Sequence, residues 1–520
     1  MTARRVHILG GGPAGMFAAR LLALRRPHWQ VYVHEGRPPA ETFGFAVGLT
    51  GGLLEALRNS DSAMSQAVTE AAHPFSRSGF RLPQGNATLT RFHTGAISRT
   101  RLLRLLLNGA LAAGVRACVG RARDVTDLLD EADLVIAADG AASPTRYRYR
   151  EEFGAEVTEG RNQFLWCGAV ARLDGGVFMP VHTEDGLFVA HAYPYGDTRS
   201  TFVVEASRET LDRAGLGDRT RTTDSTSDHE ALKHLSEAFE PLLGGGSLTG
   251  NQSRWSPFHT VRCARWQHDK VVLLGDAAAT THPSLGSGTK IAMESAIALV
   301  DALTAAQDES LTEALGRFES ARRPKVERLQ ERAGRSQLWW ESFEARQHLG
   351  PARTALSYLT RAGAVSLDDL TVSDPGLVSR ALTEFAGTEP GHAAATGPGL
   401  TRWVLGQPVH TPGNRYASRL RDNAAADTAT LEVRSGDAWG PGADSLLDRA
   451  RASVDRGADV IRLTGADSRG SLLDRLAFGE RLRVELPVLV EVTSGARHLR
   501  DAVDGVVTGR TDLVHVPDAS

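Results

Sequence analysis

Residues Val271–Lys290 read VVLLGDAAATTHPSLGSGTK and predict a strand, a loop and a helix start. Four apolar residues, Val271–Leu274, are typical of a short buried strand, and Gly275 and Asp276 end it. The glycine-rich run Gly286–Lys290 then leads into an apolar-periodic segment that is typical of a helix. A helix start offers unpaired N–H groups and the positive end of the helix dipole, so this joint can bind an anion. An ordinary strand–helix joint with glycines for packing explains the same pattern equally well.

A second glycine motif stands at the start of the chain. Val6–Leu9 predicts a strand, and the sequence GGGPAG at residues 10–15 leads from it into an apolar helix. This is a G-x-G-x-x-G motif in the strand–turn–helix setting that dinucleotide binding requires. Gly10 permits the tight turn, Gly12 lets a pyrophosphate approach the backbone, and Gly15 lets the helix pack closely on the strand.

An acidic residue completes this motif. The next predicted strand, Gln30–His34, ends at Glu35, which lies twenty residues after Gly15. An acid at this position suits the two hydroxyls of an adenosine ribose. Glycines, helix and acid together predict a dinucleotide site, although they do not distinguish FAD from NAD.

Three further segments contain residues that could contact a bound dinucleotide. Asp139 and Gly140 end another buried strand, as expected for a doubly wound sheet with polar residues at its carboxyl edge. Arg99 begins a predicted helix, where it either reaches a phosphate or is simply solvated. The glycine-punctuated segment Thr42–Leu49 either covers a flat ligand or merely crosses the domain.

Residues 157–256 change character. Alternating apolar residues and turn residues predict an antiparallel sheet inserted between two parts of the dinucleotide domain. His191 and Tyr193 are two positions apart on one strand and therefore share a face. They either line a pocket or are satisfied polar residues of a half-buried sheet, and composition alone favours the sheet.

The last third of the chain has a different pattern. A long amphipathic helix is predicted over Leu311–Phe343, and the Gly, Ala, Thr and Pro content of Gly387–Gly399 predicts a linker. Beyond it, three helix–strand units follow in residues 401–520, too few for an eight-stranded barrel.

Composition excludes several classes of protein. The net charge of −3 gives no global basic field for nucleic acid or anionic membrane. No apolar run has the length of a signal peptide or a membrane span. Cys118, Cys167 and Cys263 lack metal-site spacing, which predicts reduced thiols, no metal site and a cytoplasmic location.

The order of these motifs resembles the class A FAD-dependent aromatic monooxygenases of the p-hydroxybenzoate hydroxylase fold. More specific segments resemble the salicylyl-CoA 5-hydroxylase and 2-aminobenzoyl-CoA monooxygenase group as far as about residue 380. These segments are Phe43-Gly-Phe45, Asn162-x-Phe-x-Trp166-x-Gly168, His191-Ala-Tyr193, Ser200-Thr-Phe-x-Val-Glu205, Asn251-x-Ser-Arg-Trp255, Cys263-x-Arg-Trp266, Ser284-x-Gly-Ser-Gly-Thr-Lys290, Leu359-Thr-Arg-x-Gly363 and Asp374-Pro375.

The resemblance implies a Rossmann-like FAD-binding domain in two parts, residues 1–156 and 257–386, around a β-sheet substrate domain at 157–256. In that group the hydroxylase is often fused to an old-yellow-enzyme-like barrel. Residues 401–520, after a linker at 387–400, are then expected to be a shortened α/β remnant of such a TIM-barrel-like domain, without an FMN site.

The resemblance also implies aromatic hydroxylation, in which NAD(P)H reduces FAD and O2 then forms a C4a-hydroperoxide that the ring attacks. The expected substrate is an aryl-CoA thioester, foremost salicylyl-CoA, which would give gentisyl-CoA. The expected cofactor-binding residues are Gly10, Gly12, Pro13, Ala14, Gly15, Glu35, Gly36, Arg37, Phe45, Ala46, Val47, Arg99, Asp139, Gly140, Gly275, Asp276, Gly286, Ser287, Gly288, Thr289 and Lys290.

On the substrate side the expected residues are His282, Pro283, His191 and Tyr193, with His282 as first and His191 as second choice for the acceptor of a phenolic proton. Ala279 departs from the fold's usual Gly-Asp-Ala-Ala-His, because it occupies the histidine position.

Alternative functions stay open at this point. One is hydroxylation of anthraniloyl-CoA, a carrier-tethered aryl thioester or a free aromatic, and another is a non-catalytic flavin-binding interaction protein. A flavin halogenase is disfavoured by the lack of a WxWxIP motif. The expected partners are a small aromatic substrate and a second copy of the chain, with no nucleic acid and no membrane.

Overall fold

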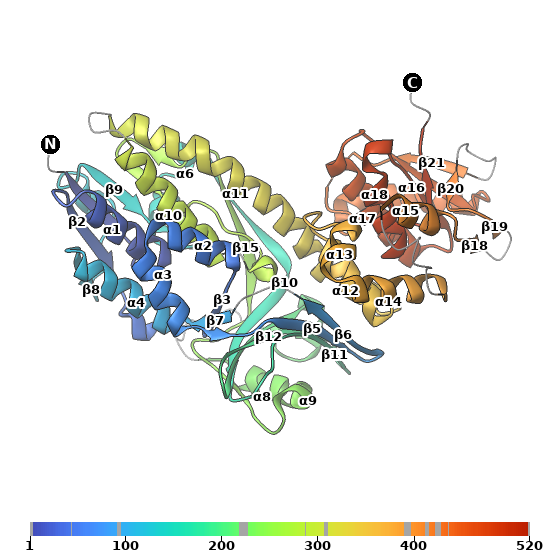
Figure 1. The fold of residues 1–520 in the computed structure, drawn as a ribbon, viewed down its shortest axis with the longest axis horizontal. Coiled ribbons are helices and arrows are strands. Elements are labelled where there is room, and N and C mark those ends of the chain that lie inside the picture. The colour runs from blue at the N-terminus through green and yellow to red at the C-terminus, as the bar shows by residue number, and fades with distance from the viewer. Residues whose placement is uncertain are drawn as a thin grey trace. The chain divides into compact units, whose positions relative to one another are not determined.

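The computed structural model describes residues 4–42, 44–90, 95–217, 227–286, 288–305, 310–388, 397–410, 415–421, 428–434 and 436–517. Two compact units make up the chain, one of residues 1–78 and 91–337 and the other of residues 79–90 and 338–520 (Figure 1). The domain limits expected at 156, 256, 386 and 400 are finer than this division and stay predictions. Ser287 and most of the expected linker lie outside the described residues.

The first unit is built on a six-stranded, mainly parallel sheet. Its strand order is β16 (Gln267–His268), β17 (Val271–Leu273), β9 (Leu134–Ala137), β1 (Arg5–Leu9), β2 (Gln30–Glu35) and β8 (Arg116–Val119). All of these strands pair in parallel except β16, which is antiparallel to β17. The strands β9 and β17 are continuous apolar runs, as a sheet buried on both faces requires, whereas β1 and β2 also bury His7 and His34. The predicted mixed α/β fold with a parallel sheet is confirmed.

Helices pack against this sheet. The helix α1 (Pro13–Arg25) contacts α4 (Arg99–Ala112), α10 (Gly288–Thr304) and strand β2, as Figure 1 shows. The long helix α11 (Leu311–Glu341) matches its predicted range to within two residues at its end. The other helical elements of this unit are η1 (Pro39–Glu41), α2 (Gly51–Ser60), α3 (Ser62–Ala71), η2 (Thr126–Leu128), α5 (Pro144–Arg148), α6 (Arg150–Phe153), α7 (Arg208–Arg213), α8 (His229–Ala238), α9 (Glu240–Leu243), η4 (Gly275–Ala277) and η5 (Pro283–Leu285).

An antiparallel sheet lies in the same unit. Within this unit the order of its strands is β14 (Leu248–Thr249), β10 (Ala155–Ala169), β13 (Arg199–Ala206), β12 (Gly186–Gly196) and β11 (Gly176–Thr183), and β15 (Ser256–Cys263) also pairs with β10. A separate three-stranded sheet consists of β3 (Ala46–Leu49), β7 (Gly95–Ser98) and β4 (His73–Pro74). In the large sheet, alternate residues point to opposite faces. One face carries small and apolar residues such as Cys167, Ala190 and Phe202, which pack with apolar residues of α8 and α9. Strand alternation therefore assigns the residues between them to the opposite face.

The second unit contains a five-stranded parallel sheet in the order β20 (Leu420–Arg421), β24 (Leu513–His515), β23 (Leu489–Thr493), β22 (Val460–Thr464) and β21 (Thr428–Glu432). The helices α16 (Asp444–Asp455), α17 (Arg469–Glu485) and α18 (Leu499–Val507) connect β21 to β24. The three predicted helix–strand units are all present. The strands β20 and β21 escaped prediction because neither contains a continuous apolar run, and only Leu431 of them is buried.

The remaining elements of the second unit are the strands β5 (Arg77–Leu82, which begins in the first unit) and β6 (Gly85–Thr90), followed by η6 (Phe343–Arg346), α12 (Pro351–Thr360), α13 (Leu367–Ser373), α14 (Pro375–Ala386), α15 (Gly397–Leu405), β18 (Val409–His410), β19 (Arg415–Tyr416), η8 (Pro441–Ala443) and η9 (Ala496–His498). An aromatic cluster forms the core beside β5, where the Phe80 ring contacts those of Trp340, Phe343 and Tyr358.

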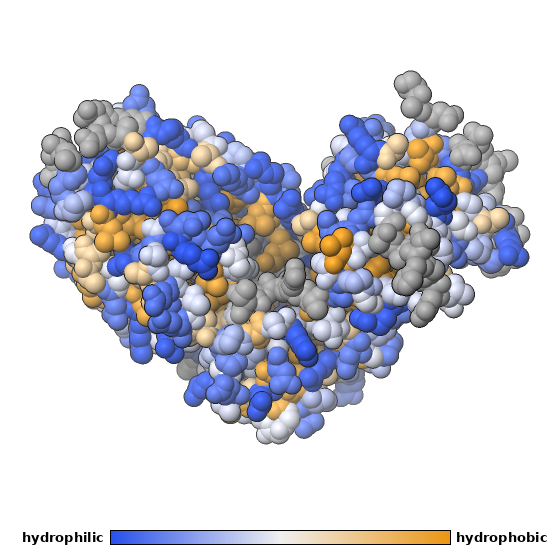
Figure 2. Space-filling view, in the orientation of Figure 1, coloured by the Kyte–Doolittle hydropathy of each residue, from blue (hydrophilic) through white to orange (hydrophobic). Residues whose placement is uncertain are grey.

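Hydrophilic residues and smaller hydrophobic areas alternate over the face drawn in Figure 2. Within the described part of the chain, no helix combines the length and the apolar character that crossing a membrane requires.

Candidate functional site

The glycine motif between β1 and α1 leaves an open space in front of a helix. Gly10 has a φ of 96°, and a Cβ there would lie 2.2 Å from the carbonyl oxygen of Ala138. A Cβ on Gly15 would lie 2.0 Å from the Gly10 oxygen. A Cβ on Gly12 would meet nothing within 4 Å. Two glycines are thus required by packing, whereas the third faces the space before the first turn of α1, which contains Pro13 and Ala14.

Glu35 lies beside this turn. Its carboxylate accepts hydrogen bonds from the Gly11 amide at 2.6 Å and the Arg37 amide at 2.9 Å. The side chain is half-buried, while Gly36 and Arg37 are exposed. Each carboxylate oxygen retains a lone pair for a ligand hydroxyl. The structure therefore brings the predicted acid next to the predicted glycine turn.

Asp276 in η4 is a carboxylate in an unusual environment. It is accessible to solvent, and among the described residues no hydrogen bond holds it. Protein atoms nevertheless surround it, and this desolvation raises the pKa of Asp276, while the nearby charges of Arg99 and Arg146 oppose the rise. Arg146 is held by the Ala277 carbonyl at 3.0 Å, and the Arg99 guanidinium by the Thr42 hydroxyl at 3.0 Å. A solvent-accessible acceptor without a hydrogen-bond partner among the described residues is suited to a hydroxyl-bearing ligand.

Asp139 has a different environment. Its carboxylate accepts from the Ser143 hydroxyl at 2.6 Å and the Thr145 amide at 3.2 Å. These bonds hold the turn that starts α5, and Gly140 adopts a φ of 85° within it. The contacts support a turn-forming role for Asp139, and its expected contact with a cofactor stays a prediction.

The segment of residues 44–47 is fixed against strand β10. A Cβ on Gly44 would lie 2.6 Å from the Trp166 ring, and one on Gly168 would lie 2.3 Å from the Phe45 ring. The Asn251 amide donates to the carbonyls of Thr42 at 2.8 Å and Gly44 at 2.9 Å. No side chain larger than hydrogen fits at either glycine without rearrangement, so these contacts determine the path of the segment.

Two further contacts complete this arrangement. The amide of Arg99 donates to the Phe45 carbonyl at 2.9 Å, and the Tyr193 hydroxyl donates to the Ala46 carbonyl at 3.0 Å. Burial raises the pKa of Tyr193, so its hydroxyl stays protonated and remains a donor. The residues Phe45, Ala46 and Val47 therefore lie between α4 and the antiparallel sheet.

The loop before α10 combines buried and exposed residues. Ala279 is 3% exposed, and its amide donates to the Gly275 carbonyl at 3.0 Å. Pro283 is exposed at the start of η5, and Gly286 ends η5 with a left-handed φ of 60°. Gly288 and Thr289 form the first turn of α10, and the Lys290 ammonium lies 3.7 Å from Glu294 one turn later.

A buried acid lies between two histidines on the face of the antiparallel sheet away from α8. One carboxylate oxygen of Glu205 lies 3.3 Å from Nε2 of His191 and 3.7 Å from Nε2 of His282. Glu205 and His282 are each 2% exposed and His191 is 9% exposed. Nδ1 of His282 accepts the Ser284 amide at 3.3 Å, which places the ring proton of neutral His282 on Nε2, toward Glu205.

Strand register explains this cluster. His191 on β12 is opposite Val203 on β13, and Glu205 follows two residues later on the same face. Trp166 on β10 is also opposite Val203, and its indole donates to the Thr201 hydroxyl at 2.7 Å. The loop before α10 supplies His282, whose ring contacts that of Phe258 at 4.2 Å between centroids.

Glu205, Trp166 and Asn251 were not among the expected site residues. The alternation of Thr201, Val203 and Glu205 was visible in the sequence, and an acid at the end of such a β pattern is an available signal. Its approach to His191 was not visible, because it depends on the strand register that places His191 opposite Val203. The contacts of Asn251 with residues 42–44 span more than 200 positions, and no local pattern predicts them.

Comparison with known proteins agrees with this geometry. The FAD binding domain family matches residues 112–333. A salicyloyl-CoA 5-hydroxylase from Streptomyces sp is 34% identical over 98% of this chain and 99% of its own length. A 3-hydroxy-4-methyl-anthranilyl-[aryl-carrier protein] 5-monooxygenase from Streptosporangium sibiricum is 35% identical over 72% of this chain and 99% of its own length.

Solved structures share the fold. The tetrameric form of 2-methyl-3-hydroxypyridine-5-carboxylic acid oxygenase matches 69% of this chain and 96% of its own, with a TM-score of 0.54 and 23% identity. P. aeruginosa PqsL in complex with 2-aminobenzoylacetate matches 66% of this chain and 98% of its own, with a TM-score of 0.52 and 21% identity.

FAD fits the residues that the structure brings together. The space before α1 is open, Glu35 lies beside it, and Asp276 offers an acceptor without a protein partner among the described residues. With the near full-length similarity to a named hydroxylase, these observations establish that the chain belongs to the class A FAD-dependent aromatic monooxygenases.

Proposed function

We propose that this enzyme hydroxylates the ring of an aryl-CoA thioester, foremost salicyloyl-CoA at the 5-position to give gentisyl-CoA, with NAD(P)H and O2. The observation that carries the proposal is the similarity over 98% of the chain to a relative named for that reaction. A carrier-tethered aryl thioester is the second candidate, because the other relative is named for such a substrate and matches 72% of the chain.

FAD, when bound, supplies the electrons and the activated oxygen of the reaction. Gly12 would let the pyrophosphate approach the start of α1, and Glu35 would bind the adenosine ribose. Asp276 would bind the ribityl chain, and the backbone of Gly286–Lys290 would stabilise negative charge at the pyrimidine edge. Phe45–Val47 would lie along the ring system. Asp139, Gly140 and Ser287 complete the proposed set.

The cluster of His191, Glu205 and His282 would accept the phenolic proton of the substrate. His282 is the less suitable direct acceptor, because its side chain is 0% exposed and both ring nitrogens are directed at protein groups. His191 is more accessible, with an 11% exposed side chain, and Glu205 orients its ring through Nε2. We therefore prefer His191 as the group that meets the substrate, with Glu205 stabilising the imidazolium that proton uptake creates.

The face around this cluster would exclude water from the ring. Trp166 and Tyr193 lie on the same face as His191, and their polar atoms bond to Thr201 and to the Ala46 carbonyl. Their apolar surfaces remain available for an aromatic substrate. Pro283 in η5 would approach the substrate from the other side of the site.

The strand order of the second unit is that of part of a barrel. Its strands β21 to β24 are adjacent in the order of the sequence and joined by helices, as consecutive strands of a barrel are. We propose that it is a shortened barrel domain without an FMN site. A cytoplasmic location and a homodimer also remain proposals, and the three free thiols support the former.

Stopped-flow flavin reduction tests the substrate class. Salicyloyl-CoA should accelerate reduction of the bound FAD by NADH or NADPH more than salicylate, anthraniloyl-CoA or a carrier-tethered ester does. Equal acceleration by free salicylate would reject the thioester requirement. NAD(P)H oxidation that no aromatic compound stimulates would reject the hydroxylase proposal and favour a flavin-binding protein without this activity.

A further inference from the structure

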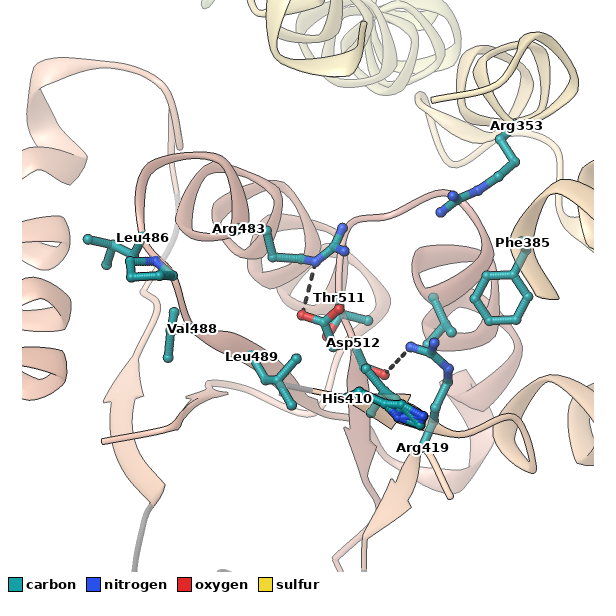
Figure 3. Close-up of a pocket in the computed structure, with 13 residues that line it drawn as sticks. Arg353, Phe385, His410, Arg419, Arg483, Leu486, Val488, Leu489, Thr511 and Asp512 are labelled. Atoms are coloured by element: carbon teal, nitrogen blue, oxygen red, sulfur yellow. Dashed lines mark hydrogen bonds and ion pairs between the residues drawn. The ribbon is translucent and has the colours of Figure 1, made fainter. Parts of the chain in front are cut away.

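The second unit contains a cavity of about 470 Å³ that takes no part in the proposed reaction. Its walls come from α12, α14 and β18, from the ends of α17 and α18, and from residues at or just before the starts of β20, β23 and β24 (Figure 3). The residues that determine its chemistry are Arg353, Phe385, His410, Arg419, Arg483 and Asp512.

The three arginines lie close to one another. The guanidinium carbons of Arg353 and Arg419 are 5.7 Å and 4.8 Å from the centre of the Phe385 ring, so both contact one aromatic side chain. Arg483 donates from Nε to the Asp512 carboxylate at 2.9 Å, and Arg419 donates to the Asp512 carbonyl at 2.9 Å. Both bonds are drawn in Figure 3. The contacts with Asp512 and Phe385 thus place all three guanidinium groups in the wall of one cavity.

Positive charge exceeds negative charge in this cavity. Among the described residues of its wall, Asp512 is the single carboxylate, and it is already bonded to Arg483. The nearby Glu384 accepts from the amides of Ala352 and Arg353, at the start of α12. Burial and the charges of Arg483 and Arg419 lower the pKa of Arg353 to about 10, although Glu384 and Asp512 oppose this. Protonated arginines therefore repel one another here.

One donor of the cluster lacks a partner. Nε of Arg419 is buried, and among the described residues it has no hydrogen-bond acceptor. A buried donor without an acceptor is rare in folded proteins, and a ligand is one common explanation. The guanidinium fork matches the oxygens of a phosphoryl group in geometry and charge. The other two nitrogens of Arg419 donate to the carbonyls of Asp512 at 2.9 Å and Pro408 at 3.2 Å. The wall of the cavity therefore combines surplus positive charge with one guanidinium whose Nε has no acceptor among the described residues.

We propose that this cavity binds the phosphoryl group of a small phosphomonoester ligand, with Arg353, Arg419 and Arg483 as its donors. Three sources share this chemistry: inorganic phosphate, the 3′-phosphate of coenzyme A and the 2′-phosphate of NADPH. Coenzyme A is the first source to test, and that choice rests on the proposed function. The CoA-named relative matches 98% of this chain, whereas the carrier-protein relative matches 72% of it over 99% of its own length and thus lacks an equivalent of more than a quarter of this chain.

Isothermal titration calorimetry on the full-length, FAD-loaded protein tests the proposal, with inorganic phosphate, CoA, 3′-dephospho-CoA, NADP⁺ and NAD⁺ as ligands. The oxidised nucleotides differ by the same 2′-phosphate as NADPH and NADH and do not reduce the flavin. At least one phosphomonoester should bind roughly ten- to hundredfold more weakly to Arg419→Gln than to the wild type, the range expected for a lost charged hydrogen bond. The preference for CoA over 3′-dephospho-CoA should also disappear in that variant if CoA is the source. If Arg419→Gln loses phosphate binding but keeps the preference for CoA over 3′-dephospho-CoA, the site binds free phosphate. If the variant loses a preference of the wild type for NADP⁺ over NAD⁺, the site binds the 2′-phosphate of the nicotinamide nucleotide.

Two control variants and a protection experiment distinguish a binding defect from a folding defect. Arg434→Gln removes an equal charge from an exposed position of the same unit and should leave all affinities unchanged. Arg419→Lys keeps the charge and should recover part of the affinity. In the wild type, phosphate should protect Arg419 but not Arg434 from modification by phenylglyoxal, as read by mass spectrometry.

Absence of protection, together with unchanged affinities in Arg419→Gln, would overturn the proposal. These measurements involve no turnover, so a negative result leaves the hydroxylation proposal untouched. Conversely, a failure to hydroxylate aryl-CoA esters leaves the phosphate-binding result valid.

Discussion

The two units of this chain differ in what some of their buried or desolvated charges do, although ion pairs such as Arg20–Asp61 occur in the first unit as well. In the second unit, buried charges neutralise one another, as Arg346 does with Glu480 and Arg462 with Glu491. In the first unit, Asp276 is accessible to solvent and has no hydrogen-bond partner among the described residues, and one oxygen of Glu205 lies near two histidines. Paired charges chiefly determine structure, whereas charges left for a ligand determine function. The arginine cavity of the second unit is an exception to this division.

The largest expected effect concerns stability in the second unit. Burial raises the pKa of Asp504 to about 8, although Arg510 and the Leu367 amide oppose the rise. The folded state therefore holds a proton that the unfolded state loses above about pH 4. Stability should fall as pH rises from about 4 to 8, by on the order of 5 kcal/mol.

Calorimetric unfolding of the full chain between pH 5 and 8 measures this dependence. Asp504→Asn keeps an acceptor for the Leu367 amide and should flatten the slope. The exposed Asp455→Asn serves as control and should leave it unchanged. A slope of equal size in Asp504→Asn would show that another group is responsible.

Glu205→Gln should affect turnover rather than stability. Without the carboxylate, His191 loses the anion that stabilises its protonated form, and hydroxylation should slow by roughly a hundred- to ten-thousandfold, the usual range for general base catalysis. FAD content and the unfolding temperature should change little. Product formation is measured by liquid chromatography, and Glu209→Gln on the exposed side of α7 is the matched control. Unchanged product formation would remove the cluster from the mechanism.

Gly15→Ala should weaken FAD binding. The added Cβ would lie 2.0 Å from the Gly10 carbonyl, so that the turn or α1 must move, at a cost of about 1–3 kcal/mol. The variant should be purified with substoichiometric flavin, as measured by absorbance. Gly334→Ala in α11 is the control, because a Cβ there meets nothing within 4 Å. Full flavin occupancy in Gly15→Ala would contradict the assigned role of this turn.

Asn251→Ala should give the smallest of these effects. It removes two hydrogen bonds to the carbonyls of Thr42 and Gly44, at a cost of about 1–3 kcal/mol that is confined to one segment. Hydrogen exchange in residues 44–49 should accelerate, and the KM for the aromatic substrate should rise. Asn108→Ala on the exposed side of α4 provides the comparison. Unaltered hydrogen exchange would mean that the contacts with β10 are sufficient to fix the segment.

Much of the first unit was predictable because its signals are local. The glycine motif, its strand and its acid follow within 35 residues, and the structure places Glu35 beside the turn. The strand before Asp276 and the helix after Gly286 were expected from the apolar pattern, and they are β17 and α10. Backbone demands on glycine and continuous apolar strands are local properties that a single sequence displays.

The substrate side was less predictable because its contacts are long-range. Glu205 meets His282 across 77 positions of sequence, and the register of β12 and β13 brings it to His191. A local pattern cannot say that His282 is covered by Phe258 and bonded to Ser284. The cavity of the second unit is a stronger case, since Arg353, Arg419 and Arg483 come from three separate segments.

The central claim is that this chain inserts oxygen into the ring of an aryl-CoA thioester. The most direct test is a reaction of the FAD-loaded enzyme with salicyloyl-CoA, NAD(P)H and ¹⁸O2, with the product analysed by mass spectrometry. We predict a hydroxylated aryl-CoA that carries one ¹⁸O atom on the ring carbon para to the existing hydroxyl. Oxidation of NAD(P)H that yields hydrogen peroxide and unchanged salicyloyl-CoA would contradict the claim.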